Sequence, residues 1–217
     1  MKQWNRDGWQ SDPWGRNFLG TPPQGRADYA FFQHILRSLD PITGRCAILF
    51  PHGVLFRKEE AEMRRELVEA DLVECVLGLG PNLFYNSPME ACAVICRSRK
   101  PAERAGQVLF IDAVDQVARE RSMSFLRPEH QKRILTAYRS WQDEPGFARI
   151  AGPETIVRQD FSLSIPLYVR RANNGSGDEA AEQRSLQELW QAWEQDGRFF
   201  WREMDGLVEM LDELTDA

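Results

Sequence analysis

Residues 72–98, LVECVLGLGPNLFYNSPMEACAVICRS, decide the fold class. Two apolar runs, 72–79 and 91–98, have the length and composition of buried strands, and a hinge of Gly, Pro and Asn joins them. Phe84 and Tyr85 lie at the tip of the hinge, where turn chemistry predicts exposure to solvent. Two adjacent aromatic side chains at such a place need either a packing role or a binding role.

Further strands and helices alternate around this unit. RCAILF (45–50) predicts a buried parallel strand, and VLFIDA (108–113) predicts a fourth strand. Helices are predicted over 28–39, over 59–70 and over 128–142, the last begun by Pro128. For the first helix we expect Asp28 as the N-cap and an apolar face that includes Phe31. The alternation predicts an α/β layer fold.

Composition divides the chain into four parts. They are a Trp-, Gly- and Pro-rich loop (1–27), the α/β body (28–171), a flexible linker (172–178) and an acidic helical tail (179–215). Three tryptophans in the first part, Trp4, Trp9 and Trp14, indicate that it packs onto something. The sequence has neither a membrane-spanning run nor a signal peptide, so we expect a cytoplasmic protein with no membrane contact.

The net charge of −6 is unevenly distributed. Residues 172–217 hold twelve acidic residues and three arginines, whereas residues 1–171 hold 24 basic and 21 acidic residues. The body is therefore mildly basic and the tail is acidic. A dedicated nucleic-acid binder usually has clustered basic residues, so the charge alone leaves the class of partner open.

The tail is predicted to be helical with a heptad-like seam. The apolar residues of this seam are Leu186, Trp190, Trp193, Phe200, Met204, Leu207, Leu211 and Leu214. Gly197 interrupts the seam once. Such a pattern is typical of a helix pair folded back on itself or of a helix that binds a partner, and the preceding linker favours the partner.

The hinge aromatics and the histidine after the first strand each have two interpretations. Phe84 is either a hydrophobic plug over the strand ends or a platform on which a flat group such as a nucleobase stacks. His52 is either a hydrogen-bonded structural residue or a general base, but no carboxylate lies within three residues to orient it.

Other motifs with catalytic or metal-binding chemistry are missing. The four cysteines, Cys46, Cys75, Cys92 and Cys96, lie in apolar runs and are predicted to be reduced core thiols rather than disulfides or metal ligands. The sequence contains no GxGxxG, P-loop, HExxH or GxSxG motif. It therefore predicts no self-contained catalytic centre.

The order PHGVLFR (51–57), PNLFY (81–85) and IPLYV (165–169) closely resembles the C-terminal half of the modification subunit of type I restriction systems. The resemblance covers residues 1–171. That family comprises adenine-N6 DNA methyltransferases, which use S-adenosylmethionine. Its glycine-rich cofactor loop and its Asn-Pro-Pro-aromatic tetrad are absent here, and TPP (21–23) is rejected as a substitute because Thr and Gln24 replace the key residues.

The resemblance implies the back half of a Rossmann-like sheet. Residues 45–50 become the fifth strand, 72–79 the sixth, and 91–98 an antiparallel seventh inserted between them. Phe84 matches the position that packs against a flipped adenine, with Asn82 and Tyr85 beside it. Pro51, His52 and Gly53 are expected in the pocket wall. No catalytic residue is assigned to this chain, which by itself is expected to be inactive.

The resemblance also implies partners. They are DNA, an N-terminal half that supplies the catalytic motifs, a specificity subunit docked on the tail residues, and a restriction subunit. The alternative is a truncated, non-catalytic modification-subunit module that binds a specificity subunit or DNA.

Overall fold

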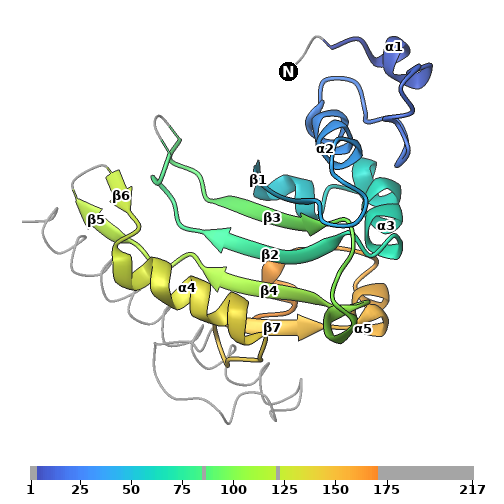
Figure 1. The fold of residues 1–217 in the computed structure, drawn as a ribbon. Helices are drawn as coiled ribbons and strands as arrows, with labels where there is room; N and C mark the ends of the chain where they lie inside the picture. The colour runs from blue at the N-terminus through green and yellow to red at the C-terminus, as the bar shows by residue number, and fades with distance from the viewer. Residues whose placement is uncertain (1–3, 85–86, 121–122, 171–217) are drawn as a thin grey trace, which may run out of the picture. The chain divides into compact units, whose positions relative to one another are not determined.

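The structure is a computed structural model that describes residues 4–84, 87–120 and 123–170. Its centre is a five-stranded sheet with the strand order β1-β3-β2-β4-β7 (Figure 1). The strands are β1 (Arg45–Pro51), β2 (Val73–Leu79), β3 (Ala91–Arg97), β4 (Val108–Ala113) and β7 (Ala148–Ala151). β2 and β4 are parallel, β3 is antiparallel to both β1 and β2, and β7 is antiparallel to β4. The predicted α/β class is confirmed. The predicted antiparallel strand is also confirmed: it is β3, which lies between β1 and β2.

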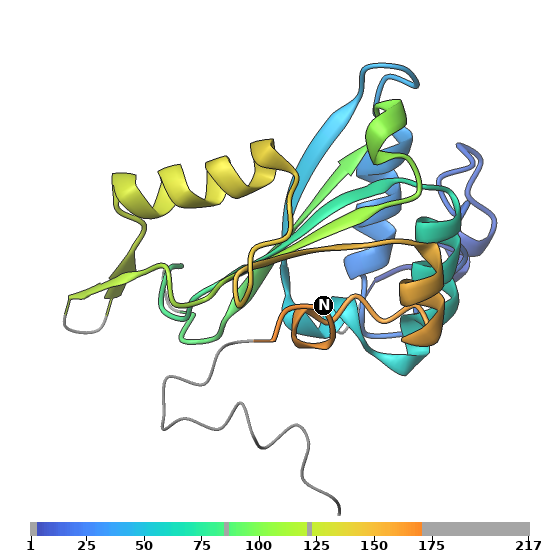
Figure 2. The ribbon, with the colours of Figure 1, turned by 90° about the horizontal axis from the view of Figure 1, so that it is seen from below.

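Helices cover both faces of the sheet (Figure 2). The helices α2 (Asp28–Arg37), α3 (Ala61–Glu69) and α5 (Pro153–Arg158) lie on one face, and α4 (Pro128–Ser140) lies on the other. Successive strand residues point to opposite faces. Phe110 of β4 accordingly joins the larger core, whereas Leu109 and Ile111 pack with Ile134 of α4. Pro128 begins α4, as predicted.

β1 differs from the prediction of a buried parallel strand. It lies at the edge of the sheet, where its hydrogen-bonded neighbour is the antiparallel β3. Its side chains alternate between partly covered and exposed, and Leu49 is 53% exposed. An apolar run therefore predicted the strand correctly but not its burial, because burial depends on which neighbours the strand receives.

The predicted details of the first helix are wrong. Ala27 is the N-cap of α2, and Asp28 is the first helical residue, with its carboxylate turned to Arg57. The buried face contains Phe32 and Gln33, whereas Phe31 is 55% exposed. The true face is thus rotated by one residue from the expected one.

The N-terminal loop packs onto α2 through a buried glutamine. Gln33 is fully buried, accepts a hydrogen bond from the backbone N–H of Leu19 at 2.7 Å, and donates one to the carbonyl of Gly20 at 2.9 Å. One short helix, α1 (Arg6–Gln10), interrupts the otherwise irregular segment. Trp14, one of the tryptophans expected to pack, is 74% exposed.

A second, two-stranded sheet was not predicted. It is the hairpin of β5 (Ala118–Glu120) and β6 (Met123–Phe125), which follows β4 and projects from the body (Figure 1). Two other elements, β7 and α5, were also missed. They are four and six residues long, too short to give a clear period.

A buried carboxylate connects three strands and α4 at the amino-terminal end of β2. Glu74 is fully buried and accepts a hydrogen bond from the Tyr138 hydroxyl at 2.7 Å. It also pairs with Arg97 at 3.4 Å and Arg104 at 3.2 Å, and Arg45 donates to the Tyr138 hydroxyl at 2.7 Å. Burial and the bond to Glu74 raise the pKa of Tyr138.

All four cysteines are free thiols, and three of them are buried. The described residues contain no His, Cys, Asp and Glu cluster that could hold a metal ion. Within the same ranges, no helix has the length and apolar character needed to cross a membrane. The predicted linker and tail, including every seam residue, lie outside the described residues.

Candidate functional site

A crevice of about 220 Å³ lies beside Phe84, between the end of β1 and the start of β3. Its lining residues are Leu49, Phe50, Pro51, Phe84, Ser87, Met89, Glu90 and Ala91. The crevice is smaller than the roughly 300–1,000 Å³ typical of whole-ligand sites, so it fits one flat ring system rather than a complete cofactor. Its walls are mostly apolar, with one carboxylate at the rim.

Hydrogen bonds and close packing hold the described residues of the hinge that carries Phe84. Phe84 is 36% exposed and forms an isolated antiparallel bridge with Ser87, whose N–H donates to the Phe84 carbonyl at 3.0 Å. Asn82 has a left-handed backbone with φ of 60°, which Asn tolerates better than most residues. Gly80 packs so closely on the chain that a Cβ there would lie 2.4 Å from the carbonyl oxygen of Val114.

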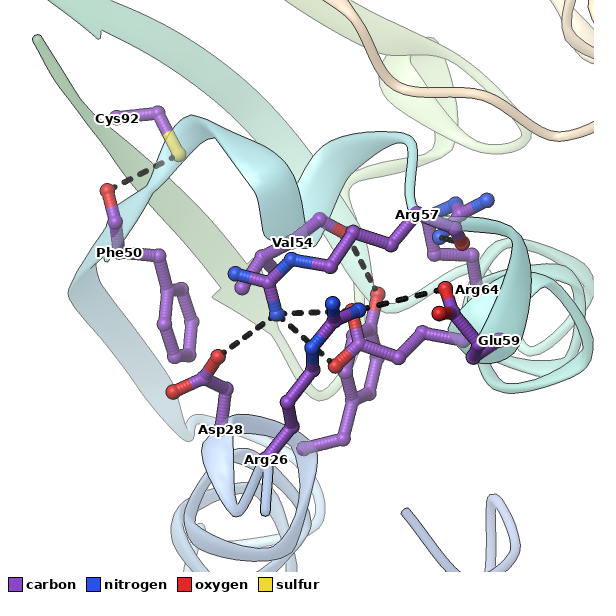
Figure 3. Close-up of polar contacts among 10 residues, drawn as sticks. Arg26, Asp28, Phe50, Val54, Arg57, Glu59, Arg64 and Cys92 are labelled. Atoms are coloured by element: carbon purple, nitrogen blue, oxygen red, sulfur yellow. Dashed lines mark hydrogen bonds and ion pairs between the residues drawn. The ribbon is translucent and has the colours of Figure 1, made fainter. Parts of the chain in front are cut away.

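An ion-pair network that includes the buried Glu60 holds the segment 51–57, which follows β1 (Figure 3). Arg57 donates to Asp28 at 3.0 Å and to Glu60 at 3.2 Å. Its guanidinium covers Gly53, because a Cβ on Gly53 would lie 2.5 Å from Arg57 Nε. Arg64 in turn donates to the Arg57 carbonyl at 2.7 Å. The network locks the turn that follows β1.

The surroundings of this network raise the pKa of both Arg57 and Glu60. Burial raises the pKa of the fully enclosed Glu60, although the positive charge of Arg57 works against this rise. Burial also disfavours the charged form of Arg57, but its bond to Asp28 and the charge of Glu60 outweigh burial and raise its pKa. Arg57 therefore stays protonated and compensates two carboxylates.

The residues predicted to form the site reach the crevice unequally. Phe84 and Pro51 line it, and Pro51 is paired in register with Ala91. His52 Nε2 donates to the Ala91 carbonyl at 2.8 Å, so its ring ties the end of β1 to the start of β3. Gly53 and Asn82 are not among the lining residues in the described ranges. Tyr85 lies outside the described residues.

Asn82 instead connects the hinge to the β5–β6 hairpin. Its backbone carbonyl accepts a hydrogen bond from the N–H of Ser124 at 2.9 Å, and Ser124 is 4% exposed. Sequence reasoning did not predict this contact, because the hairpin was not predicted.

Other supporting residues were also missed. Arg57 and Glu60 received no role, although their spacing allows an ion pair, and Asp28 was expected only as a helix N-cap. Ile165, from the segment IPLYV, packs over Gly78 of β2, where a Cβ would lie 2.9 Å from its Cδ1 atom. The segment IPLYV therefore packs on the face of the sheet over β2.

Comparisons with known proteins identify the wider family. A family model described as N-6 DNA Methylase matches residues 1–176. The type I restriction enzyme MjaVII methylase subunit of Methanocaldococcus jannaschii is 34% identical over 181 residues, covering 76% of this chain and 31% of the relative. The HindI methylase subunit of Haemophilus influenzae is 33% identical over 181 residues, covering 79% of this chain and 40% of the relative.

A solved structure shares both sequence and fold. It is the methyltransferase subunit of a type I restriction-modification system from Streptococcus thermophilus, with 34% identity and a TM-score of 0.72. The match covers 78% of this chain and 36% of that one. The chain thus spans about a third of the length of the relatives it matches. With a family model covering most of its length, the chain belongs to the N-6 DNA methylase family.

Proposed function

We propose that this chain supplies the target-base pocket of an adenine-N6 DNA methyltransferase of a type I restriction-modification system. The observation that carries the proposal is the crevice beside Phe84, which Phe84 of the segment PNLFY and Pro51 of the segment PHGVLFR both line. The target base must leave the duplex before its amino group can be reached. A ring stacked on Phe84 would gain about 1–3 kcal/mol.

S-adenosylmethionine is the cofactor that the family implies, but the described residues do not fit it. The space beside Gly53, which follows β1, and beside Gly80, which follows β2, is filled by the chain's own atoms, Arg57 in one case and the carbonyl of Val114 in the other. Neither leaves room for a ligand against the backbone. The proposal therefore places the cofactor in an N-terminal half, together with the Asn-Pro-Pro-aromatic tetrad.

The free edge of β1 supports a complementing half. Among the described residues, β1 pairs with β3 alone, so its seven residues present unpaired backbone groups on the other side. Native sheets rarely leave such an edge open, because it invites pairing with another strand. A strand of the N-terminal half is the natural neighbour of β1.

The face of the sheet beside α4 supports the same interpretation. An apolar groove of about 400 Å³ crosses β1, β3 and β2 next to α4. Ala47, Leu77, Ile95 and Leu135 are among its lining residues. Packing of a further helix from the N-terminal half would cover these side chains and remove apolar area from water.

The proposed partners are DNA, the N-terminal half, a specificity subunit and a restriction subunit. The similar proteins are methylase and methyltransferase subunits of type I enzymes, which is consistent with assembly into a larger complex. Docking of the specificity subunit on the acidic tail remains a proposal from the sequence pattern. The competing function is a non-catalytic modification-subunit module that binds a specificity subunit or DNA.

Reconstitution tests the function. The chain is co-expressed with the N-terminal half of a type I modification subunit and a specificity subunit, and transfer of labelled methyl groups from S-adenosylmethionine to DNA adenine is measured. We expect transfer from the complete set and none from the chain alone. A chain that assembles with these partners but never supports transfer would establish the non-catalytic module, and transfer by the chain alone would refute the division of motifs.

A further inference from the structure

The β5–β6 hairpin carries exposed apolar side chains next to the Phe84 hinge. Met123 and Phe125 are 52% and 41% exposed, and they alternate with the buried Ser124 on one strand. Met123 and Phe125 consequently point to the same face of the hairpin, away from the body. The hydrogen bond from Ser124 N–H to the Asn82 carbonyl fixes this face relative to the hinge.

Exposed apolar residues are concentrated around the crevice and the hairpin. Of the thirteen large hydrophobic side chains exposed on the described residues, five belong to the crevice or to the hairpin. They are Leu49, Phe84, Met89, Met123 and Phe125. Apolar side chains that stay exposed together usually mark a place where a partner binds.

The charge of the same region selects the kind of partner. Residues 118–133 contain five basic and two acidic residues, whereas the remainder of residues 1–171 has equal numbers of each. The whole positive excess of the body is therefore carried by the hairpin and the first part of α4. Arg119 is exposed on β5, and Arg127, whose side chain is 55% exposed, follows β6 and lies 3.9 Å from Glu120.

We propose that the β5–β6 hairpin binds duplex DNA beside the flipped base. Met123 and Phe125 pack against bases and sugars in a groove, as apolar wedges do in proteins that open or bend DNA. Arg119 and Arg127 contact the flanking phosphates, whose attraction depends on salt concentration. This inference rests on the proposed function, because it places the duplex next to the crevice that receives the base. An acidic surface of a partner protein is the competing occupant.

The test measures binding of the 217-residue chain to a short fluorescein-labelled DNA duplex by anisotropy over a range of salt concentrations. M123S/F125S should weaken binding about tenfold with an unchanged salt slope, because it removes apolar contacts but no charge. R119A/R127A should lower the salt slope by about two. The matched control, I42S/V157S, changes two side chains that are 65% and 54% exposed elsewhere, and should bind like the wild type.

Several results would overturn the proposal. The first is that the wild type does not bind the duplex at low salt. The second is that M123S/F125S binds the duplex as tightly as the control variant. The third is that the hairpin variants lose binding to the specificity subunit but bind DNA normally. Urea unfolding verifies that each variant is folded. The hairpin proposal and the proposed function can fail separately. If DNA binding depends on the hairpin but the reconstituted set transfers no methyl groups, only the proposed function is refuted. If both hairpin variants support methyl transfer as well as the wild type does, only the hairpin proposal is refuted.

Discussion

Replacing Arg57 by Met tests whether the ion-pair network stabilises the turn behind the crevice. The substitution leaves Glu60, which is fully buried, without its counter-charge. Removing one partner of a buried ion pair costs about 3–5 kcal/mol. Because the Arg57 side chain is 19% exposed, we expect the lower end, about 3 kcal/mol at neutral pH.

The loss should depend on pH with a definite sign. Burial already raises the pKa of Glu60 above its ordinary value of 4.5, so protonation of Glu60 favours the folded state. Without Arg57 the pKa rises further. The penalty is therefore largest where the buried carboxylate is charged, and it shrinks as the pH falls and Glu60 takes up a proton.

Urea unfolding followed by tryptophan fluorescence measures the free energy of unfolding at neutral and mildly acidic pH. R57M/E60M should recover most of the loss, because an apolar pair of similar volume replaces the buried ions. The control R65M removes an exposed i,i+4 pair with Glu69 and should cost only about 0.3–0.5 kcal/mol. A loss below about 1 kcal/mol for R57M, or a double variant no more stable than R57M, would refute the reasoning.

Three further predictions concern the hinge and the sheet. Phe84→Ala should slow methylation by the reconstituted enzyme, because it removes one base–aromatic stack worth about 1–3 kcal/mol, and should leave S-adenosylmethionine binding nearly unchanged. An unchanged turnover rate would show that Phe84 is a hydrophobic plug instead. Gly80→Ala should destabilise the chain by about 2 kcal/mol or more in urea unfolding, because its Cβ meets a backbone oxygen at 2.4 Å, whereas Gly152→Ala, with nothing within 4 Å, should be nearly neutral. Tyr138→Phe should cost about 1.5 kcal/mol by removing the hydroxyl bonded to Glu74, and unfolding at alkaline pH should show a smaller difference between the two proteins as the tyrosine of the wild type ionises.

The sequence predicted the sheet better than the site. Long apolar runs such as 72–79 and 108–113 lie in the centre of the sheet and match strands nearly residue for residue. The run at 45–50 gave a strand but not its exposure, because the neighbours of an edge strand are set by tertiary structure. Phe31 and Phe32 could not be ranked by composition, since both are apolar and only one faces the sheet.

The supporting network behind the crevice could not be predicted from local pattern. Asp28 and Arg57 are 29 residues apart and meet only after the turn behind β1 has packed on α2. The hairpin strands are three residues each, which is too short for a period to emerge. Phe84 became a candidate because two aromatic residues interrupt a turn, a signal that needs no long-range information.

The carboxylate of Glu74 has a consequence for how the chain folds. Its hydroxyl donor, Tyr138, is 64 residues away in sequence, and Arg45, which binds that hydroxyl, is 93 residues away from Tyr138. Closing loops of this length is slow compared with forming a helix, and the carboxylate, although paired with Arg97 and Arg104, lacks its hydroxyl donor until they close. The strand that carries Glu74 therefore gains its full stability late, and folding of the sheet should be an all-or-none event that a chain ending before α4 cannot complete.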